Sequence, residues 1–140
     1  REIQTNSRPF SAPCVILAAG ETTTKISDNA EIRGHGGPSH ELVAAFALAA
    51  SKVPGACMLS IDTEGTDGTT LYAGGLTDSK TAEAARLAGI DLYEALRGHA
   101  VGEALVALND AVFTGNTGTN LCDLNVLYVP AAASDRFKKS

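Results

Sequence analysis

The hydrophobic positions of the chain form two patterns: short continuous apolar runs, and one long segment with helical spacing. The continuous runs predict β-strands, because buried strands are short, apolar and bounded by turn residues. The segment Pro38–Lys52 predicts an α-helix that begins at its proline and ends before Pro54 and Gly55. One apolar face of this helix, spaced i, i+3, i+4 and i+7, is formed by Val43, Phe46, Ala47 and Ala50.

Strand-like and helix-like segments alternate along the whole chain. The expected strands are Cys14–Gly20, Thr22–Ile26, Ala56–Ile61, Ala111–Phe113 and Asn125–Val129. The further expected helices are Asp78–Leu87, Asp91–Arg97 and Gly102–Leu108, and an expected turn consists of Ser27, Asp28 and Asn29. This order predicts the α/β class, with a mixed sheet flanked by helices in a single compact domain. The first two strands are expected to pair, and Ala56–Ile61, which shows no alternation, is expected to be covered on both faces.

The two ends of the chain lack such patterns. Residues 1–13 are polar and contain two prolines, which predicts a linker from an upstream domain. Residues 131–140 predict a flexible tail. The expected domain therefore spans residues 14–130.

Composition narrows the class of protein. Hydrophobic residues make up 44% of the 140 residues, which predicts one globular domain with a real core. The net charge of −5 argues against a general nucleic-acid binder, which needs a basic face. No apolar run approaches the ~18 residues of a membrane span. We therefore expect no membrane partner. The three cysteines form no C-x-x-C pair, so we expect free thiols and a cytoplasmic location.

The first candidate site is the loop Arg33–Glu41, whose glycines lead into the long helix. A helix amino terminus presents free N–H groups and a positive dipole end, and Gly36 and Gly37 allow close approach of an anion. The alternative is that these glycines only make the turn, while Ser39 and Glu41 cap the helix.

The second candidate is the loop Asp62–Gly68, which follows the apolar run Ala56–Ile61. Its carboxylates, Asp62, Glu64 and Asp67, are the oxygen ligands that suit Mg²⁺. The alternative is a solvated acidic loop with Asx turns.

The third candidate is the loop Thr114–Leu124. Thr117, Thr119 and Asn120 offer donors and acceptors, and Gly118 leaves a backbone N–H open for the oxygens of an anionic ligand. The alternative is a network of side-chain to backbone hydrogen bonds that fixes an irregular turn.

Several common motifs are absent from the chain. It contains no G-x-G-x-x-G, no P-loop, no G-x-S-x-G and no H-E-x-x-H. His35, His40 and Glu41 are therefore interpreted as polar residues of a loop and a helix surface, and His99 as a surface histidine.

Taken together, the loops resemble the MOFRL domain, the C-terminal domain of bacterial and archaeal glycerate 2-kinases, which are often called hydroxypyruvate reductases. The matching positions are Gly20–Thr23, Gly34, Gly36, Gly37, Glu41, Thr63, Gly65, Asp67, Gly68, Thr114, Gly115, Thr117–Asn120, Asp123 and Leu124. The last motif is the most specific, since eight of these positions fall in one short loop. The resemblance covers roughly Cys14–Val129.

The resemblance implies an α/β domain that closes against a larger N-terminal domain, with the active site in the cleft between them. It implies phosphorylation of D-glycerate, or a related small hydroxy acid, by ATP with Mg²⁺, and an isolated chain without activity. Glu64 and Asp67 are the expected catalytic and metal-binding residues. The expected substrate or phosphate contacts are Glu21, Thr22, Gly36, Gly37, Thr117, Gly118, Thr119 and Asn120. A homo-oligomer remains open.

Three departures from the family pattern bear on activity. Many members read GGRNQE, where this chain has Pro38 in place of the arginine; Asp62–Gly65 stands where Gly-Thr-Asp-Gly is usual; and Asn116 replaces a proline. Two further hypotheses therefore stay open: a non-catalytic ligand-binding domain that kept the fold, and an NAD(P)-linked hydroxypyruvate reductase.

Overall fold

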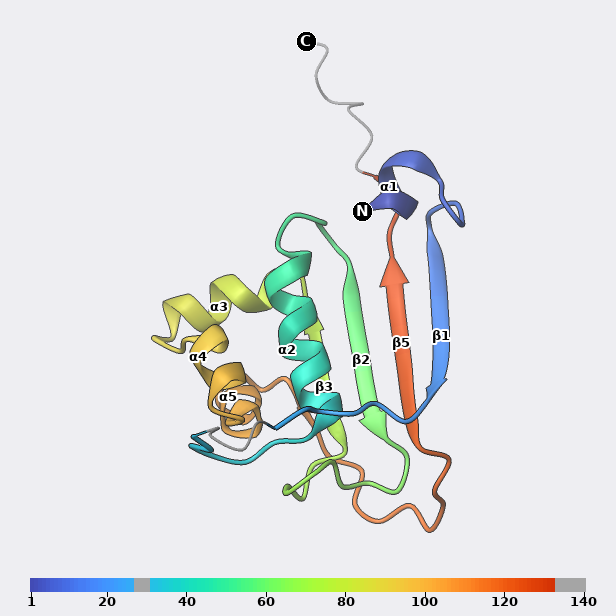
Figure 1. The fold of residues 1–140 in the computed structure, drawn as a ribbon. Coiled ribbons are helices and arrows are strands. Elements are labelled where there is room, and N and C mark those ends of the chain that lie inside the picture. Colours follow the sequence, from blue (N-terminus) through green and yellow to red (C-terminus); the bar gives the residue numbers. More distant parts are fainter. Residues whose placement is uncertain (27–30, 133–140) are drawn as a thin grey trace.

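The structure is a computed structural model, and it describes residues 1–26 and 31–132. Its centre is a five-stranded sheet in the order β1-β5-β2-β3-β4 (Figure 1). The strands are β1 (Cys14–Gly20), β2 (Cys57–Asp62), β3 (Gly74–Asp78), β4 (Ala111–Val112) and β5 (Asp123–Val129). The helices are α1 (Glu2–Asn6), α2 (Pro38–Ala50), α3 (Thr81–Leu87), α4 (Leu92–Arg97) and α5 (Val101–Leu108). The predicted α/β class is confirmed.

The direction of the strands corrects one prediction. Every pair of neighbouring strands in the described chain is antiparallel, so the sheet is not mixed. The connection from β1 through α2 to β2 is of the kind that produces parallel neighbours. However, β5 lies between β1 and β2 and runs antiparallel to both, so the two strands that share a direction never touch.

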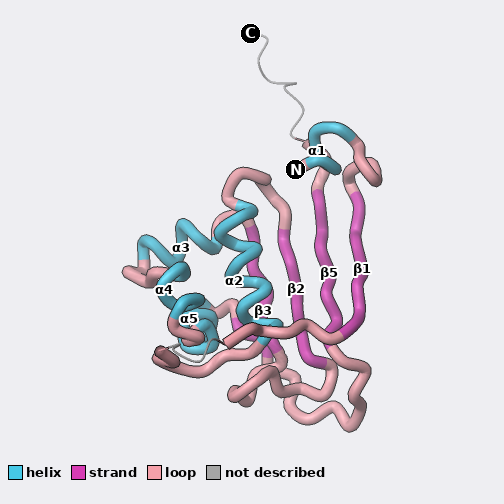
Figure 2. Tube along the Cα trace, in the orientation of Figure 1, coloured by secondary structure: helices cyan, strands magenta, loops and turns pink. Residues whose placement is uncertain are grey.

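Two further elements differ from the prediction. Thr22–Ile26 is not a strand; this segment crosses the lower end of the sheet as a loop (Figure 2). Strand β3 was not predicted, because Gly74 and Gly75 at its start disfavour a strand assignment. The absent side chain of Gly75 is what lets helices approach here, since a Cβ at this position would come within 2.8 Å of Val43 and Leu105.

The core lies between the sheet and α2. Val43, Ala44, Val101 and Leu105 are fully buried in one cluster, and the alanines Ala47, Ala85 and Ala104 join Leu92 in a second. Each buried Val or Leu side chain stabilises the fold by about 1.5–3 kcal/mol. The small residues allow α3, α4 and α5 to pack closely around α2, on one side of the sheet (Figure 1).

The opposite face of the sheet is open. This corrects the prediction that Ala56–Ile61, the segment of β2, is covered on both faces. The Thr77 hydroxyl donates to the Val43 carbonyl at 2.8 Å, so Thr77 faces α2 and its neighbour Leu76 faces away. The strand register aligns Leu76 with Leu59, Val126 and Leu17 on that outer face. Leu17 is 68% exposed and Leu76 is 49% exposed.

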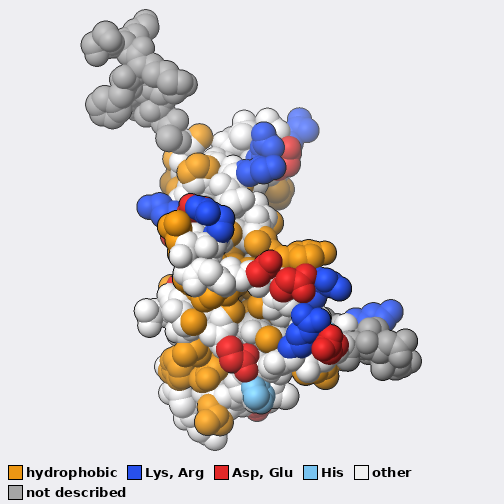
Figure 3. All heavy atoms as spheres, turned by 90° about the vertical axis from the view of Figure 1, so that its left-hand side faces the viewer, with side chains coloured by type: hydrophobic (Ala, Val, Ile, Leu, Met, Phe, Trp, Pro, Cys, Tyr) orange, Lys and Arg blue, Asp and Glu red, His pale blue; other side chains and the backbone are white. Residues whose placement is uncertain are grey.

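On the helix side of the molecule, charged side chains of both signs are interspersed among apolar ones (Figure 3). Ion pairs on this side join Glu83 to Arg86 and Glu94 to Arg97 at 2.7 and 2.9 Å. No helix in the described ranges is long and apolar enough to cross a membrane.

The structure describes residues 1–13, the predicted linker, but only the beginning of the predicted tail, residues 131–140. Residues 1–13 contain the short helix α1, and the Gln4 amide donates to the Pro130 carbonyl at 3.3 Å. The predicted turn at residues 27–29 and most of the predicted tail lie outside the described residues.

Candidate functional site

All three candidate loops lie at one end of the sheet. Gly20, which ends β1, pairs with Asp123, which begins β5, and Asp123 also pairs with Asp62 at the end of β2. The loops that leave these positions therefore emerge side by side at the lower end of the molecule (Figure 2). Helix α2 begins at the same end (Figure 1).

The loop after β2 and the loop before β5 hold one another through direct hydrogen bonds, which we call the loop clasp (Thr63 and Glu64 with Thr117–Cys122). Thr63 Oγ1 accepts from the Leu121 N–H at 2.7 Å and donates to the Cys122 carbonyl at 2.8 Å. The Asn120 amide donates to Glu64 Oε2 at 2.9 Å. Gly65 supplies the close approach, since its φ is +105° and a Cβ there would lie 2.0 Å from the Gly115 carbonyl oxygen. The clasp thus brings Glu64, Thr117 and Asn120 together.

Many polar groups of residues 114–124 are used in hydrogen bonds within this loop or in the loop clasp. The Gly118 N–H is bound to Asn116 Oδ1 at 2.8 Å, and the Thr117 N–H donates to the Glu64 carbonyl at 3.2 Å. The network of side-chain to backbone bonds is therefore present. The Thr119 hydroxyl has no hydrogen-bond partner within residues 1–26 and 31–132, and Thr119 is exposed. Contact of this hydroxyl with a ligand remains a prediction.

Carboxylates gather beside the clasp where the strands end. The Thr22 N–H donates to Asp123 Oδ2 at 2.8 Å, which places Glu21 next to this strand end. A hydrogen bond to the Glu21 carboxylate, together with desolvation and the charges of Glu21, Asp123 and Asp62, raises the pKa of the Cys122 thiol. The thiol is therefore protonated at neutral pH. In the part of the chain that is described, no group of three or more His, Cys, Asp or Glu side chains has the geometry to hold a metal ion.

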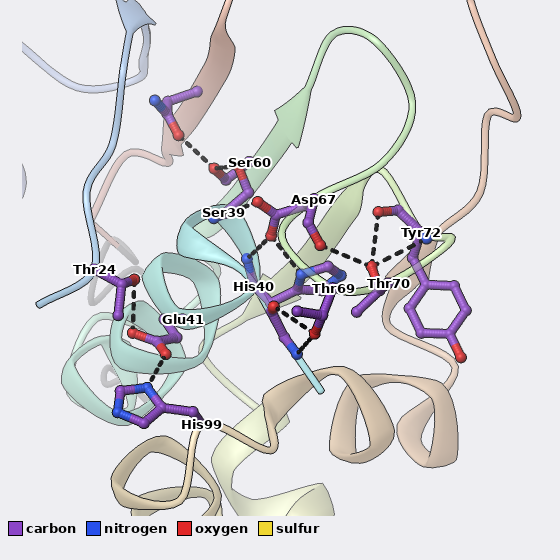
Figure 4. A network of polar contacts seen from close by, with 12 residues as sticks. Thr24, Ser39, His40, Glu41, Ser60, Asp67, Thr69, Thr70, Tyr72 and His99 are labelled. Carbon is purple, nitrogen blue, oxygen red and sulfur yellow. Dashed lines mark hydrogen bonds and ion pairs between the residues drawn. The ribbon is translucent and has the colours of Figure 1, made fainter. Parts of the chain in front are cut away.

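The two predicted metal ligands have different surroundings. Glu64 is exposed and bonds to Asn120 in the clasp. Asp67 is only 2% exposed and accepts hydrogen bonds from the backbone N–H groups of Ser39 (3.3 Å) and His40 (2.9 Å) at the start of α2 (Figure 4). The Asp67 carboxylate is thus committed to a helix amino terminus. Metal binding by Asp67 remains a prediction that its burial does not favour.

Asp67 also occupies the place expected for an external anion. The predicted donors were the free N–H groups at the beginning of α2, and two of these are already bonded to Asp67. A Cβ on Gly37 would lie 2.5 Å from the Asp67 carboxyl, so this glycine makes room for the internal carboxylate. The Gly36 N–H lies 3.4 Å from Thr69 Oγ1. Contacts from Gly36 and Gly37 to substrate or phosphate remain predictions.

His40 is buried, not on the helix surface as predicted. Its exposed fraction is 0%, and its Nδ1 lies against Asp67 Oδ2. Neither ring nitrogen makes a hydrogen bond in the described part of the chain, so the contact of Nδ1 with Asp67 is a close charge contact, and the ring stands edge-on to Tyr72 with centroids 6.1 Å apart. The sequence did contain a signal, because position 40 precedes the buried Val43 and Ala44 by three and four residues and so lies on the same helix face.

His99, predicted to be a surface residue, lies in a pocket with Glu41. His99 Nδ1 is 2.7 Å from Glu41 Oε1, and Thr24 Oγ1 donates to Glu41 Oε2 at 3.0 Å (Figure 4). The open pocket has a volume of about 500 Å³ and is lined by these three residues and by the Gly34–Pro38 segment. Glu41 and His99 are 58 positions apart, and nothing in the sequence pattern links them.

The fold and the loops define an α/β domain of a known type. The family model described as "MOFRL family" matches residues 14–123, and the chain therefore belongs to the MOFRL family. The resemblance seen in the loop motifs is confirmed.

The relatives of this chain are larger proteins. The chain is 37% identical over 129 residues to the glycerate 2-kinase of Pyrococcus horikoshii, an alignment that covers 92% of this chain and 28% of that protein. It is 36% identical to a putative hydroxypyruvate reductase of Agrobacterium vitis, with 86% and 27% covered. The crystal structure of the glycerate kinase of Thermotoga maritima matches with a TM-score of 0.83 at 34% identity, with 91% of this chain and 30% of that chain covered. The chain thus spans less than a third of the length of these relatives.

Proposed function

We propose that the chain is the C-terminal domain of a glycerate 2-kinase-like enzyme. The proposed reaction is the transfer of the γ-phosphoryl group of ATP to D-glycerate or a related hydroxy acid, with Mg²⁺, at a cleft shared with an N-terminal domain. The observation that carries the proposal is the gathering of the three family loops at one end of the sheet, in a chain 37% identical to a protein named glycerate 2-kinase.

The residues at the end of the sheet where the three loops meet could contribute to phosphoryl transfer by binding metal and phosphate. That reaction depends on positioning and charge neutralisation and needs no protein nucleophile. The exposed carboxylates of Glu21 and Glu64 are hard oxygen ligands, and Mg²⁺ is commonly held by one or two carboxylates plus phosphate oxygens. The Thr119 hydroxyl is free to donate to an oxygen of the substrate or phosphate. These groups would supply part of the ligands of a magnesium–nucleotide complex at the edge of this domain, since the described residues hold no complete metal site.

The absence of positive charge from the loops after β2 and before β5 supports a cleft shared with an N-terminal domain. Residues 62–73 and 113–122 contain no lysine or arginine. A triphosphate bound there needs cations from the metal and from other parts of the protein. This need supports a site completed by an upstream domain.

The test is ADP release by the whole protein that contains this chain, with Mg-ATP and D-glycerate. We expect turnover that requires both substrates, and we expect Thr119→Val to lower it without lowering the melting temperature. A folded protein that releases no ADP with D-glycerate or other hydroxy acids contradicts the proposal.

A second candidate, an NAD(P)-linked reductase, is favoured by the name of the Agrobacterium relative alone. Its test is NADH oxidation that depends on hydroxypyruvate. The third candidate, a non-catalytic binding domain, predicts a thermal shift with hydroxy acids and no ADP release or NADH oxidation.

A further inference from the structure

The pocket beside the start of α2 contains a histidine held by a carboxylate. His99 comes from the turn between α4 and α5, Glu41 from the first turn of α2, and Thr24 from the loop after β1. Three segments far apart in the sequence therefore meet at one pocket wall (Figure 4). No lysine or arginine lines this pocket within the described ranges, so its ionisable groups are Glu41, His99 and the more exposed His35.

Glu41 is fixed from two sides. Its Oε1 binds His99 Nδ1 at 2.7 Å, while its Oε2 accepts from the Thr24 hydroxyl at 3.0 Å. The carboxyl side chain is only 20% exposed, and that of His99 is 17% exposed. A carboxylate bound to Nδ1 holds the proton of a neutral imidazole on that nitrogen and leaves Nε2 as a proton acceptor.

The backbone of His99 adopts a left-handed conformation. Its φ is +51°, in the left-handed region, where a residue other than glycine costs roughly 1–2 kcal/mol. His99 Nε2 makes no hydrogen bond to any residue that the structure describes. The strained position therefore presents an unused acceptor beside an open pocket.

We propose that His99 is the general base that removes the proton from the hydroxyl group of the acid substrate, and that Glu41 is its positioning residue. The inference rests on the proposed kinase function. As the hydroxyl oxygen forms its bond to the γ-phosphorus of the nucleoside triphosphate, its proton passes to His99 Nε2. The bond from that phosphorus to the bridging oxygen breaks, and the nucleoside diphosphate leaves with the electron pair.

The polar groups of the pocket suit a hydroxyl group. The pocket holds a carboxylate and no permanently charged cation among the described residues, so the charge of the transferred phosphoryl group must be neutralised by groups outside its lining. A hydroxyl group, which can donate to Nε2 and accept from a threonine hydroxyl, matches the groups that are present.

The test uses His99→Gly in the whole protein. Glycine fits the left-handed backbone, so the fold is retained, and the lost ring leaves space for imidazole from solution. Since general-base catalysis contributes about 100- to 10,000-fold, we expect kcat to fall by about 100-fold or more with little change in KM for D-glycerate. Added imidazole should restore much of the loss. His35→Gly is the matched comparison, because His35 Nδ1 also lies 2.7 Å from a carboxylate, that of Glu103, at a 69% exposed side chain; imidazole should not increase its rate.

Glu41→Gln tests the positioning role. We expect kcat to fall while KM for D-glycerate stays close to that of the wild type, because Glu41 acts through His99 and does not touch the substrate. A His99→Gly enzyme with unchanged kcat, or a fall in kcat that imidazole does not reverse, overturns the proposal.

A separate readout distinguishes failure of this inference from failure of the kinase function. Histidine modification by diethylpyrocarbonate is followed by peptide mass spectrometry, with and without D-glycerate and without nucleotide. Protection of His99 by D-glycerate supports the contact even if no ADP is released. Equal modification of His99 with and without D-glycerate overturns it in a protein that is otherwise inactive.

Discussion

The buried contacts of Asp67 and the loop clasp behave in opposite ways in this domain, although the loop Asp62–Gly68 contributes to both. The segment around Asp67 and the segment around Thr117 are both rich in glycine, threonine and polar side chains. Asp67 is 2% exposed and binds the beginning of α2, whereas Glu64, three residues earlier, is exposed and binds Asn120 in the loop clasp. Burial, and not residue type, separates a carboxylate that holds the fold from one that is open to a ligand.

The largest expected effect is at the buried carboxylate. Asp67→Ala removes the acceptor for two helix N–H groups and leaves His40 buried without its partner. Breaking a buried pair in this way costs about 3–5 kcal/mol, and we expect that loss in the free energy of unfolding, measured by urea titration. Glu64→Gln is the control, with an expected change within about 0.5 kcal/mol. Equal losses for the two variants would remove the distinction between the buried and the exposed carboxylate.

Glycines in the two loops offer a second comparison. Gly68 has φ +60°, and a Cβ there would lie 2.2 Å from the Gly36 carbonyl oxygen, whereas Gly118 has φ +73° with nothing within 4 Å. Gly118→Ala should cost only the backbone strain, about 1–2 kcal/mol. Gly68→Ala should cost more, since the backbone must also move, and its melting temperature should be clearly the lower of the two. The reverse order would show that the exposed loop is the more rigid one.

The loop clasp should contribute less than the buried network. Thr63→Val removes two hydrogen bonds, to Leu121 and Cys122, and should lower the free energy of unfolding by about 1–2 kcal/mol. The matched control is Thr66→Val, because Thr66 is exposed and makes no side-chain hydrogen bond to the described residues. Chemical denaturation of both variants measures the difference, and no difference would mean that water replaces the clasp without cost.

The smallest expected effect concerns pH. Burial raises the pKa of Asp110, the Thr81 hydroxyl opposes this shift, and the charge of Asp78 adds to it. A carboxyl whose pKa is higher in the folded state destabilises the fold when ionised, so this cost is present above the folded pKa and disappears as pH falls below the unfolded value. Asp110→Asn should therefore raise the melting temperature slightly at pH 7, and the gain should vanish near pH 3. A gain that is the same at both pH values would point to a cause other than ionisation.

Much of the fold could be predicted from periodicity. Helix α2, strand β2 and strand β5 follow from their apolar patterns, to within two residues at their ends. Strand β3 could not be predicted, because Gly74 and Gly75 disfavour a strand; Gly74 lies against the backbone of β2, and Gly75 lies against Val43 and Leu105. The antiparallel sheet depends on where β5 inserts, which is a property of the whole chain and not of any local segment.

The candidate site was predictable in its loops but not in its contacts. The motifs around Gly36, Glu64 and Thr117 identified the three segments that meet at one end of the sheet. The pairs Asp67–His40 and Glu41–His99 join residues 27 and 58 positions apart, and such pairing follows from tertiary packing. Periodicity could have shown that His40 is buried, but no pattern shows which carboxylate faces it.

The carboxylate of Asp67 is an intramolecular ligand of the N–H groups at the start of α2. A group attached through a short loop has an effective concentration on the order of millimolar or more at its site, and this one cannot diffuse away. A phosphate from solution that reached the same N–H groups of Ser39 and His40 would have to displace a permanent competitor and leave His40 without its partner. The helix end therefore behaves as an anion site that is already saturated, and recognition of a ligand at this end of the domain falls to the side chains of the surrounding loops.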